Sequence, residues 1–486
     1  MLEPWKALFN ISFNSEKSLV EQITAHIRKE IIKGRLEPGM TLPGSRILAQ
    51  DIGVNRKTIV FAYESLIAEG WLETRYKSGT FVAANLPVST EEKTITTAIA
   101  NFRFTEFSAN LTNDYILNSA AVTFSSGTPD TRLAPVKEIS RAYRRIFQQK
   151  GAWKILGYNN GKGDLKLREM ISLMLSRDRG LFVEKEELCI TRGSQMGLYL
   201  AINVLVKPGD IAVMELPGYQ ATYKLFKNAG ARLMPVNVDK DGFDVDQLEA
   251  ICIKNPVKVV YITPHHQFPT TVTMKAARRL KLLELSIRFG FAIIEDDYDH
   301  EYHYGAGNNL ALASHELAVN VIYLSSLSKL IAPAIRIGYI TGSAAFMKSL
   351  VNLRIHIDRQ GDMIMERAIA DLIEDGTLRR HNKRVISIYQ QKRDLVEALL
   401  IEHFDQNEIE FEKPEGGLAY WIKLKKKMDL NQFMKDLGEH GVKITPPHSY
   451  FWEGTVYPIL RLDFGSLNEK ELETGITRIA EVYHNI

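Results

Sequence analysis

The chain has 486 residues, more than one ordinary domain holds, so two or three globular units are expected. Its apolar content of 45 % and charged content of 24 % are typical of a soluble globular protein. The net charge of +3 is too small to identify a nucleic-acid binder by itself. The two cysteines, Cys189 and Cys252, argue against a disulfide framework and predict a reducing, cytoplasmic location. We expect neither a signal peptide nor a transmembrane helix, because no suitable apolar run occurs.

The first predicted unit, residues 12–84, contains three helices and a β-hairpin. An apolar residue recurs every four positions in the first helix: Leu19, Ile23, Ile27 and Ile31. After the turn GRLEPGMTLPGS, Ser45 is expected to cap a short second helix, and a third helix begins at Asn55. The segment WLETRYKSGTFVA predicts a hairpin around a Lys-Ser-Gly turn. Together these elements predict a winged helix-turn-helix domain.

Polar residues gather at the N-terminal end of the third helix, which is the end that contacts base edges in this type of domain. Asparagine and arginine there can make bidentate contacts with adenine and guanine, while a threonine and free amides suit phosphates. A lysine in the hairpin turn can reach the minor groove or the backbone. The candidate DNA contacts are Arg46, Asn55, Arg56, Lys57, Thr58 and Lys77. The alternative is that these are solvated polar residues of an ordinary small helical domain.

Residues 85–114 are rich in threonine and charge and predict an interdomain linker. Beyond it, residues 115–486 alternate apolar strands with helical segments. The predicted strands are 211–216, 258–263, 291–295 and 321–326. This order predicts an α/β domain with a mostly parallel sheet, whose ligand sites gather at the carboxyl ends of the strands.

Lys329 lies just past the last of these strands, in SSLSKLIAPAIRIGY. A lysine that forms a Schiff base needs an enclosed site that lowers its pKa. The hydroxyls of Ser326 and Ser328, with the guanidinium of Arg336, can hold a phosphate. The S-x-S-K pattern alone is weak, because many surface loops carry it.

Three acids end the strand in IIEDDYD, and they need partners if they are buried. One carboxylate there can pair with a protonated pyridine nitrogen, and Tyr298 can donate to a phenolic oxygen of the same cofactor. The alternatives are a solvated acidic junction or a Mg²⁺ site.

Two further segments suit an anionic, flat cofactor. A strand ends in Gly193-Ser194-Gln195 where a helix begins, and the free amides with the Ser194 hydroxyl form an anion site. Tyr219 follows a Pro-Gly turn, where it can stack on a heterocycle, although a tyrosine there is more often simply packed.

Together these motifs resemble the MocR/GabR group of bacterial regulators, in which a GntR-type winged helix precedes a fold-type-I aminotransferase-like domain. The likeness covers almost the whole chain. Its C-terminal motifs are TPHHQFPTT, IIEDDYDHEY, SLSKLIAPAIRIGY and ILRLDFGSL, in the family's order. The resemblance implies an α/β fold with large and small subdomains, pyridoxal 5'-phosphate as cofactor, operator DNA as partner, and a head-to-tail homodimer.

The resemblance also assigns roles by position. It gives Lys329 the internal aldimine, Asp296 the pyridine nitrogen, Tyr298 the phenolic oxygen, and Tyr219 the stacking contact. The phosphate would be held by Ser194, Gln195, Ser326, Ser328 and Arg336, together with Tyr158 from the partner subunit. Arg461 would bind the carboxylate of an amino-acid effector. His266 and Gln267 would line the cofactor's edge without an assigned role.

The sequence departs from the family pattern at several positions. Thr271 and Ala334 stand where glycine is usual, which removes easy access to positive φ and predicts a locally different backbone. Gln220, Ala221 and Tyr450 stand where the members that respond to GABA carry arginines, which counts against GABA as the effector. Gly44 replaces the usual serine before Ser45 and weakens one phosphate contact.

The resemblance implies a transcription regulator that senses an amino compound, or the cofactor itself, through aldimine exchange at Lys329. Effector binding would shift the population of orientations open to the winged helices. A working aminotransferase with an attached DNA-binding domain is the alternative, because every residue for half-transamination is present. A third reading is a DNA-binding protein with an inert cofactor domain.

Overall fold

The computed structural model describes residues 8, 9, 11, 13, 17–87, 122–124, 127–305, 310–453 and 457–486. Contacts within the chain divide it into two compact units, Met1–Thr112 and Asn113–Ile486. The predicted linker, residues 85–114, lies outside the described residues from position 88 onward. Each unit encloses its own hydrophobic core.

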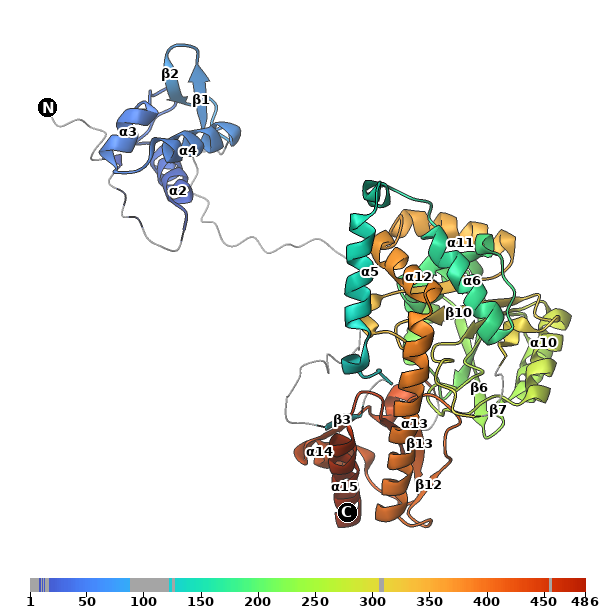
Figure 1. Ribbon diagram of the computed structural model, residues 1–486. Helices are drawn as coiled ribbons and strands as arrows, with labels where there is room; N and C mark the ends of the chain where they lie inside the picture. Colours follow the sequence, from blue (N-terminus) through green and yellow to red (C-terminus); the bar gives the residue numbers. More distant parts are fainter. Residues whose placement is uncertain are drawn as a thin grey trace. The chain divides into compact units, whose positions relative to one another are not determined.

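Residues 17–87 of the N-terminal unit form three helices and a hairpin (Figure 1). Their bounds are α2 Leu19–Ile32, α3 Ser45–Asp51, α4 Arg56–Ala68, β1 Leu72–Arg75 and β2 Gly79–Val82. The helices enclose a core that includes Ile27, Leu48 and Ile59. This arrangement confirms the predicted winged helix-turn-helix.

Two details of this unit differ from the sequence prediction. Only three of the four stripe residues are buried, because Leu19 is the first residue of α2 and is 41 % exposed at the open helix end. Ser45 does not cap α3. Gly44 takes the N-cap position in an extended conformation, and Ser45 is already helical, so its hydroxyl is not aimed at the free amides.

An eight-stranded sheet forms the centre of the large lobe of the second unit, in the order β4-β11-β10-β9-β8-β5-β6-β7. The run from β10 to β6 is parallel, while β11 and β7 are antiparallel to their neighbours. The strands are β4 Leu188–Thr191, β5 Ile211–Leu216, β6 Arg232–Asp239, β7 Gly242–Phe243, β8 Val257–Ile262, β9 Ala292–Asp296, β10 Val321–Ser326 and β11 Gly338–Thr341. This sheet confirms the predicted α/β class.

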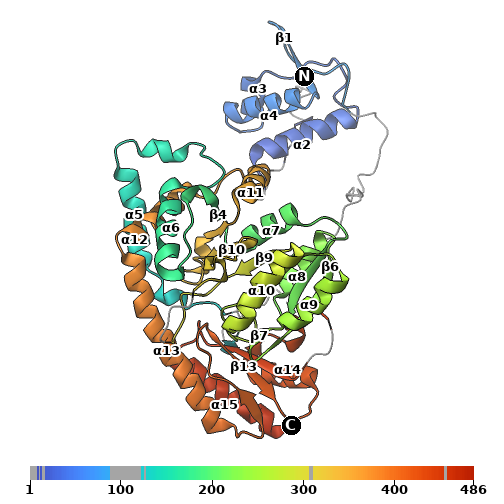
Figure 2. The ribbon, with the colours of Figure 1, turned by 90° about the vertical axis from the view of Figure 1, so that its right-hand side faces the viewer.

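The central strands β5, β8 and β10 are buried along almost their whole length because helices cover both faces of the sheet (Figure 2). The helices of this lobe are α5 Val136–Gln148, α6 Leu165–Arg179, α7 Ser194–Leu205, α8 Gln220–Asn228, α9 Val245–Lys254, α10 Ala276–Phe289, α11 Ala344–Ile357 and α12 Met363–Glu374. Short 3₁₀ helices are η1 Thr131–Leu133, η2 Ala152–Leu156, η3 Lys185–Glu187, η4 Leu312–Ser314, η5 Pro333–Ile335 and η6 Pro447–Tyr450.

A small lobe completes the second unit, and the long helix α13, Thr377–His403, runs from the large lobe into it (Figures 1 and 2). Strands β12 Ile409–Phe411, β13 Ala419–Leu424 and β15 Ile459–Asp463 form an antiparallel sheet. Strand β3 Val122–Phe124 pairs in parallel with β14 Val442–Ile444. Helices α14 Leu430–Glu439 and α15 Glu469–Asn485 pack beside these strands.

In the part of the chain that the structure describes, no helix is both long enough and apolar enough to cross a membrane. Both cysteines are free and buried, as the sequence predicted.

Candidate functional site

Lys329 lies three residues beyond the carboxyl end of β10, and 17 % of its side chain is exposed. Its Nζ lies 4.2 Å from the centre of the Tyr298 ring and 4.0 Å from Oδ2 of Asp299. Burial disfavours the ammonium form and lowers the pKa of Lys329. This is the environment that a nucleophilic, Schiff-base-forming lysine requires.

Asp296 ends β9, next to β10 in the sheet. Its Oδ2 accepts a hydrogen bond of 2.8 Å from the Tyr261 hydroxyl, whereas its buried Oδ1 has no partner among the described residues. Burial raises the pKa of this carboxyl to about 7. A buried oxygen without a donor is costly, so the geometry fits a ligand that brings a protonated ring nitrogen.

The Tyr298 hydroxyl donates to the backbone carbonyl of His266 at 2.7 Å. That hydrogen bond holds the ring under Lys329 and aims the hydroxyl at the protein backbone. A donation from Tyr298 to a cofactor's phenolic oxygen therefore requires the hydroxyl to exchange this partner.

The residues of the predicted anion site lie at the ends of the strands β4, β10 and β11. Gly193 precedes α7 with a φ of 77°, and a side chain there would meet the Arg336 guanidinium at 2.7 Å. A Cβ on Gly338 would lie 2.7 Å from the backbone nitrogen of Ser194, which shows how closely the two loops approach. The site thus joins free helix amides to a guanidinium, the donor set that phosphate prefers.

Ser326 and Ser328 lie beside this anion site, and the Ser326 hydroxyl donates to the Ser328 hydroxyl at 3.0 Å. Arg336 donates to the carbonyl of Arg192 at 2.9 Å. Gln195 is an exposed residue in the first turn of α7. The residues present therefore fit a phosphate group, with hydroxyl, guanidinium and amide donors at one end of the sheet.

An aromatic cluster that includes Tyr298 lies near the lysine, and its central residue, Phe268, was not among the predicted site residues. The Phe268 ring contacts Tyr219 at 5.3 Å, Tyr298 at 6.3 Å and Tyr450 at 5.9 Å between ring centres. Tyr219 is 37 % exposed and is the N-cap residue of α8. The feature of the sequence that could have indicated Phe268 was its position as the apolar residue inside the motif TPHHQFPTT.

Arg461 reaches the same region from β15 of the small lobe, and it is buried. It forms an ion pair with Asp463, two residues along the strand. Asp463 was not among the predicted site residues. Arg461, the residue expected to bind an effector carboxylate, therefore already has a carboxylate partner inside the protein that was not predicted.

His266 and Gln267 have partners of their own. His266 Nδ1 lies 3.0 Å from Oδ1 of Asp299. The Gln267 amide donates to Glu215 at 3.2 Å and to the carbonyl of Pro217 at 3.0 Å. Both residues orient the loop that follows β8.

The two departures from glycine have different outcomes. Thr271 keeps a left-handed backbone with a φ of 64°, and its N–H donates to the Gln267 carbonyl at 2.7 Å. A threonine in this conformation costs about 1–2 kcal/mol, which the surrounding loop offsets. Ala334 lies in η5 and does not have a positive φ.

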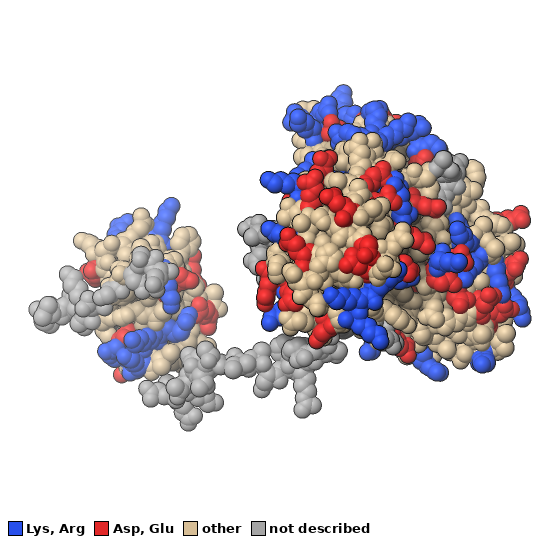
Figure 3. All heavy atoms as spheres, turned by 90° about the horizontal axis from the view of Figure 1, so that it is seen from below, with Lys and Arg blue, Asp and Glu red and all other residues tan. Residues whose placement is uncertain are grey.

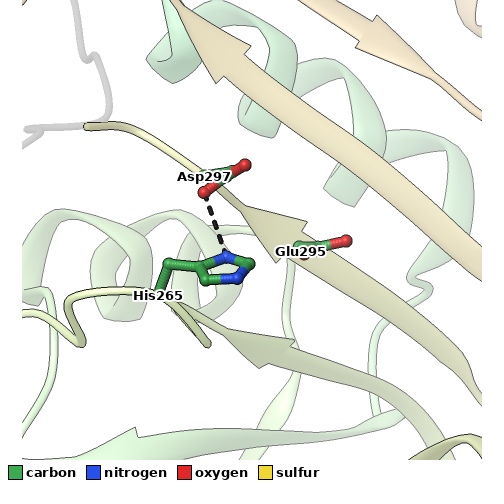
Figure 4. A group of neighbouring side chains, drawn as sticks. All are labelled: His265, Glu295 and Asp297. Atoms are coloured by element: carbon green, nitrogen blue, oxygen red, sulfur yellow. Dashed lines mark ion pairs between the residues drawn. The ribbon is translucent and has the colours of Figure 1, made fainter. Parts of the chain in front are cut away.

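The acids at the end of β9 do not form a solvated junction. His265, Glu295 and Asp297 are buried and lie close enough to suggest a metal site (Figure 4). Each of the three residues already has a partner outside the cluster. Arg179 pairs with Asp297 at 2.8 Å and contacts His265 at 2.9 Å, and Glu295 accepts from the amides of Leu312 and Ala313 at 2.7 and 2.8 Å.

A second guanidinium, that of Arg279, lies 3.2 Å from the other nitrogen of His265. Burial lowers the pKa of His265 to about 4, and the Arg179 charge holds the pKa of Asp297 well below its usual range. Two cations already balance these carboxylates, so the cluster suits a structural charge network rather than a divalent cation.

Tyr158 is 80 % exposed, and the guanidinium of Arg359 lies 4.1 Å from its ring centre. No contact between Tyr158 and Lys329 is found in the described part of the chain. The structure therefore does not bring Tyr158 into the site within one subunit.

The predicted DNA contacts lie on the N-terminal unit, where lysine and arginine side chains gather over part of the surface (Figure 3). Arg46, Asn55, Arg56, Lys57 and Lys77 are exposed, and Thr58 is half-buried. Asn55 is the N-cap of α4, and its side-chain oxygen accepts from the Lys57 amide at 2.9 Å. Lys77 has a φ of 58° in the hairpin turn.

Residues 120–479 match the family described as aminotransferase class I and II, and residues 19–82 match the bacterial regulatory proteins of the gntR family. The chain is 26 % identical to the probable rhizopine catabolism regulatory protein MocR of Rhizobium meliloti, over 95 % of this chain and 93 % of the relative. It is 27 % identical to the transcriptional regulator TauR of Rhodobacter capsulatus, over 97 % and 98 %.

Among solved structures, the multiple substrate aminotransferase of Thermococcus profundus is 27 % identical, with a TM-score of 0.73. The match covers 79 % of this chain and 97 % of that enzyme. These likenesses, together with the donor set around Lys329, indicate pyridoxal 5'-phosphate as the cofactor. The chain belongs to the aminotransferase class I and II family and carries a gntR-family domain before it, which confirms the resemblance to the MocR/GabR regulators.

Proposed function

We propose that this protein is a cytoplasmic, pyridoxal 5'-phosphate-dependent transcription regulator that senses a small primary amine at Lys329. The observation that carries the proposal is the presence, in one chain with a winged helix, of the half-buried Lys329 and of a buried Asp296 oxygen that has no partner among the described residues. If Lys329 and Asp296 had only structural roles, the buried Asp296 oxygen would be left without a hydrogen-bond donor.

Pyridoxal 5'-phosphate, when bound, supplies an aldehyde carbon that condenses reversibly with a lysine or with a free amine. Asp296 holds a proton on the ring nitrogen, and Tyr219 covers one ring face. Ser194, Gln195, Ser326, Ser328 and Arg336 hold the phosphate through hydroxyl, amide and guanidinium donors. If an effector amine took the place of Lys329, the charge and packing around Asp299 and Tyr298 would change, because both lie near the Lys329 Nζ.

A homodimer would supply two winged helices for paired half-sites. The exposure of Tyr158 supports its proposed role, which is to reach the phosphate of a partner subunit. Arg56 and Lys57 at the start of α4, with Arg46 and Lys77, are the proposed contacts to operator DNA. Asn55 reads a base through its amide nitrogen, because its oxygen caps the helix.

The retained cofactor residues also favour a second candidate, a working aminotransferase. One experiment separates the two. Steady-state turnover of amino donors with 2-oxo acids is measured beside binding of the DNA upstream of the gene. We expect tight operator binding and little sustained turnover. Sustained turnover with no affinity for that DNA would establish the enzyme instead.

A further inference from the structure

Arg461 and Asp463 lie two residues apart on β15, so both side chains are on the same face of the strand. Both are buried and form an ion pair. An Arg461 guanidinium that is paired with a carboxylate differs from a free guanidinium, because the ion pair has no net charge with which to attract a ligand.

The donors of Arg461 are largely used within the protein. Its Nε donates to the carbonyl of Pro269 at 3.1 Å, and a second edge of the guanidinium bonds Asp463. The Tyr450 hydroxyl also bonds Arg461. A bidentate grip on an incoming carboxylate requires two parallel N–H groups, and such a carboxylate would have to displace Asp463 to obtain them.

The Asp463 carboxylate borders the same space as the Lys329 Nζ. A Cβ placed on Gly127 would lie 3.1 Å from Asp463 Oδ1, 3.2 Å from Lys329 Nζ and 3.6 Å from Nη2 of Arg461. The three polar groups therefore converge on the space beside the Gly127 backbone. Within the described residues, the other carboxylate oxygen of Asp463, Oδ2, is buried and accepts no hydrogen bond.

Apart from Lys329, the described side chains around the Arg461–Asp463 ion pair are aromatic rather than positively charged. Phe268 lies 4.7 Å from the Arg461 guanidinium, and Tyr450 contacts both Phe268 and Trp421. Aromatic faces attract cations and apolar groups and offer nothing to a carboxylate. Gln220 and Ala221 add no positive charge at the start of α8.

We propose that Asp463 selects the effector: the site takes a primary amine that bears a second hydrogen-bond donor, as in an amino alcohol or a diamine, and disfavours an α-amino acid. A hydroxyl or ammonium group satisfies the free oxygen of Asp463, whereas a carboxylate meets a like charge and finds Arg461 already paired. The inference rests on the proposed function, because it requires the effector amine to react at Lys329.

The test uses the full-length protein loaded with pyridoxal 5'-phosphate and three probes of one carbon skeleton. L-alanine carries a carboxylate, L-alaninol replaces it with a hydroxymethyl group, and 1,2-diaminopropane replaces it with an aminomethyl group. Binding is followed by the change in visible absorption, and independently by the rise in the midpoint of thermal unfolding that a native-state ligand produces. We expect L-alaninol or the diamine to bind at least about tenfold more tightly than L-alanine.

Asp463→Asn removes the charge and nearly keeps the shape, so it should free the Arg461 charge and reverse the preference toward L-alanine by about tenfold or more. Asp246→Asn is the matched control, because Asp246 is exposed on α9 and its loss removes the same charge. A purely structural role for Asp463 would weaken all three probes alike.

The inference is overturned if the wild-type protein binds L-alanine as tightly as both L-alaninol and the diamine, or if the Asp463→Asn preference equals that of the control. The wild-type comparison stands even if the variant does not fold. A protein that takes up no cofactor, or whose absorption no amine changes, would refute the proposed function and the inference with it. Preference for L-alanine in a cofactor-loaded protein would refute the inference alone.

Discussion

The hydroxyl of Tyr261, on β8, donates a hydrogen bond of 2.8 Å to Asp296 at the end of β9. That bond holds the carboxylate in one orientation and leaves its second oxygen directed away from Tyr261 without a partner in the described chain. The two neighbouring strands thus prepare an acceptor before any ligand is bound.

Asp296→Asn should weaken cofactor binding. The variant loses the charge that pairs with a protonated ring nitrogen, and hydrogen bonds to charged groups contribute about 1.5–3 kcal/mol, so we expect a loss of about tenfold or more in affinity. Titration of the apoprotein with pyridoxal 5'-phosphate, followed by visible absorption, measures the effect. Asp246→Asn should bind as the wild type does, and equal affinities for both variants would remove Asp296 from the site.

The same residue predicts a pH dependence in the apoprotein. Burial raises the pKa of Asp296 to about 7 from the ordinary 3.8, so the folded state holds the proton more tightly than the unfolded state. The contribution of Asp296 to the free energy of unfolding is therefore full at low pH and is lost as the pH rises from about 4 to about 7. Relative to Asp296→Asn, the wild type should lose stability across this window, by at most about 1.4 kcal/mol per pH unit.

Urea unfolding of both proteins at a series of pH values measures this difference. Saturation with the cofactor should flatten it, because a protonated ring nitrogen compensates the ionised carboxylate. A wild-type stability that stays constant relative to the variant would show that Asp296 is ionised throughout the range.

Arg179→Met should strongly destabilise the protein. The substitution removes the guanidinium that pairs with the buried Asp297 beside Glu295, and breaking a buried pair in this way costs about 3–5 kcal/mol. Arg177→Met on the same helix is the control, because the pair of Arg177 with Asp178 is exposed and should contribute no more than about 1 kcal/mol. Chemical unfolding of the two variants compares them directly. Equal effects would contradict the buried network.

Arg56→Ala should weaken operator binding by about 1–3 kcal/mol if the side chain reads a base. The decisive measurement is the ratio of operator to unrelated DNA affinity at fixed salt, since a lost phosphate contact weakens both. Lys29→Ala, an exposed cation on α2, removes the same charge and should leave that ratio unchanged. If Arg56→Ala leaves this affinity ratio unchanged, Arg56 either contacts the DNA backbone or only supports the fold of the domain.

Much of the fold followed from local patterns. The strands at 211–216 and 321–326 have the predicted bounds, and those near 258 and 292 are displaced by one residue. Their apolar runs can only be buried on two faces, so the sequence determined the layered sheet and the position of Lys329 just beyond a strand. The three-helix plan of the first unit also followed, because its apolar residues recur at helical spacing.

The partners of the functional side chains depended on tertiary structure. Arg179, on α6, meets Asp297 only because the sheet brings those segments together, and no sequence pattern links them. Asp463 and Arg461 are two residues apart in the sequence, yet their common burial beside Lys329 requires the small lobe to close on the ends of the large sheet. Long-range charge pairing is set by packing and not by periodicity. The sequence therefore singled out the lysine that we propose as the cofactor-binding residue, and the tertiary structure decided which charges surround it.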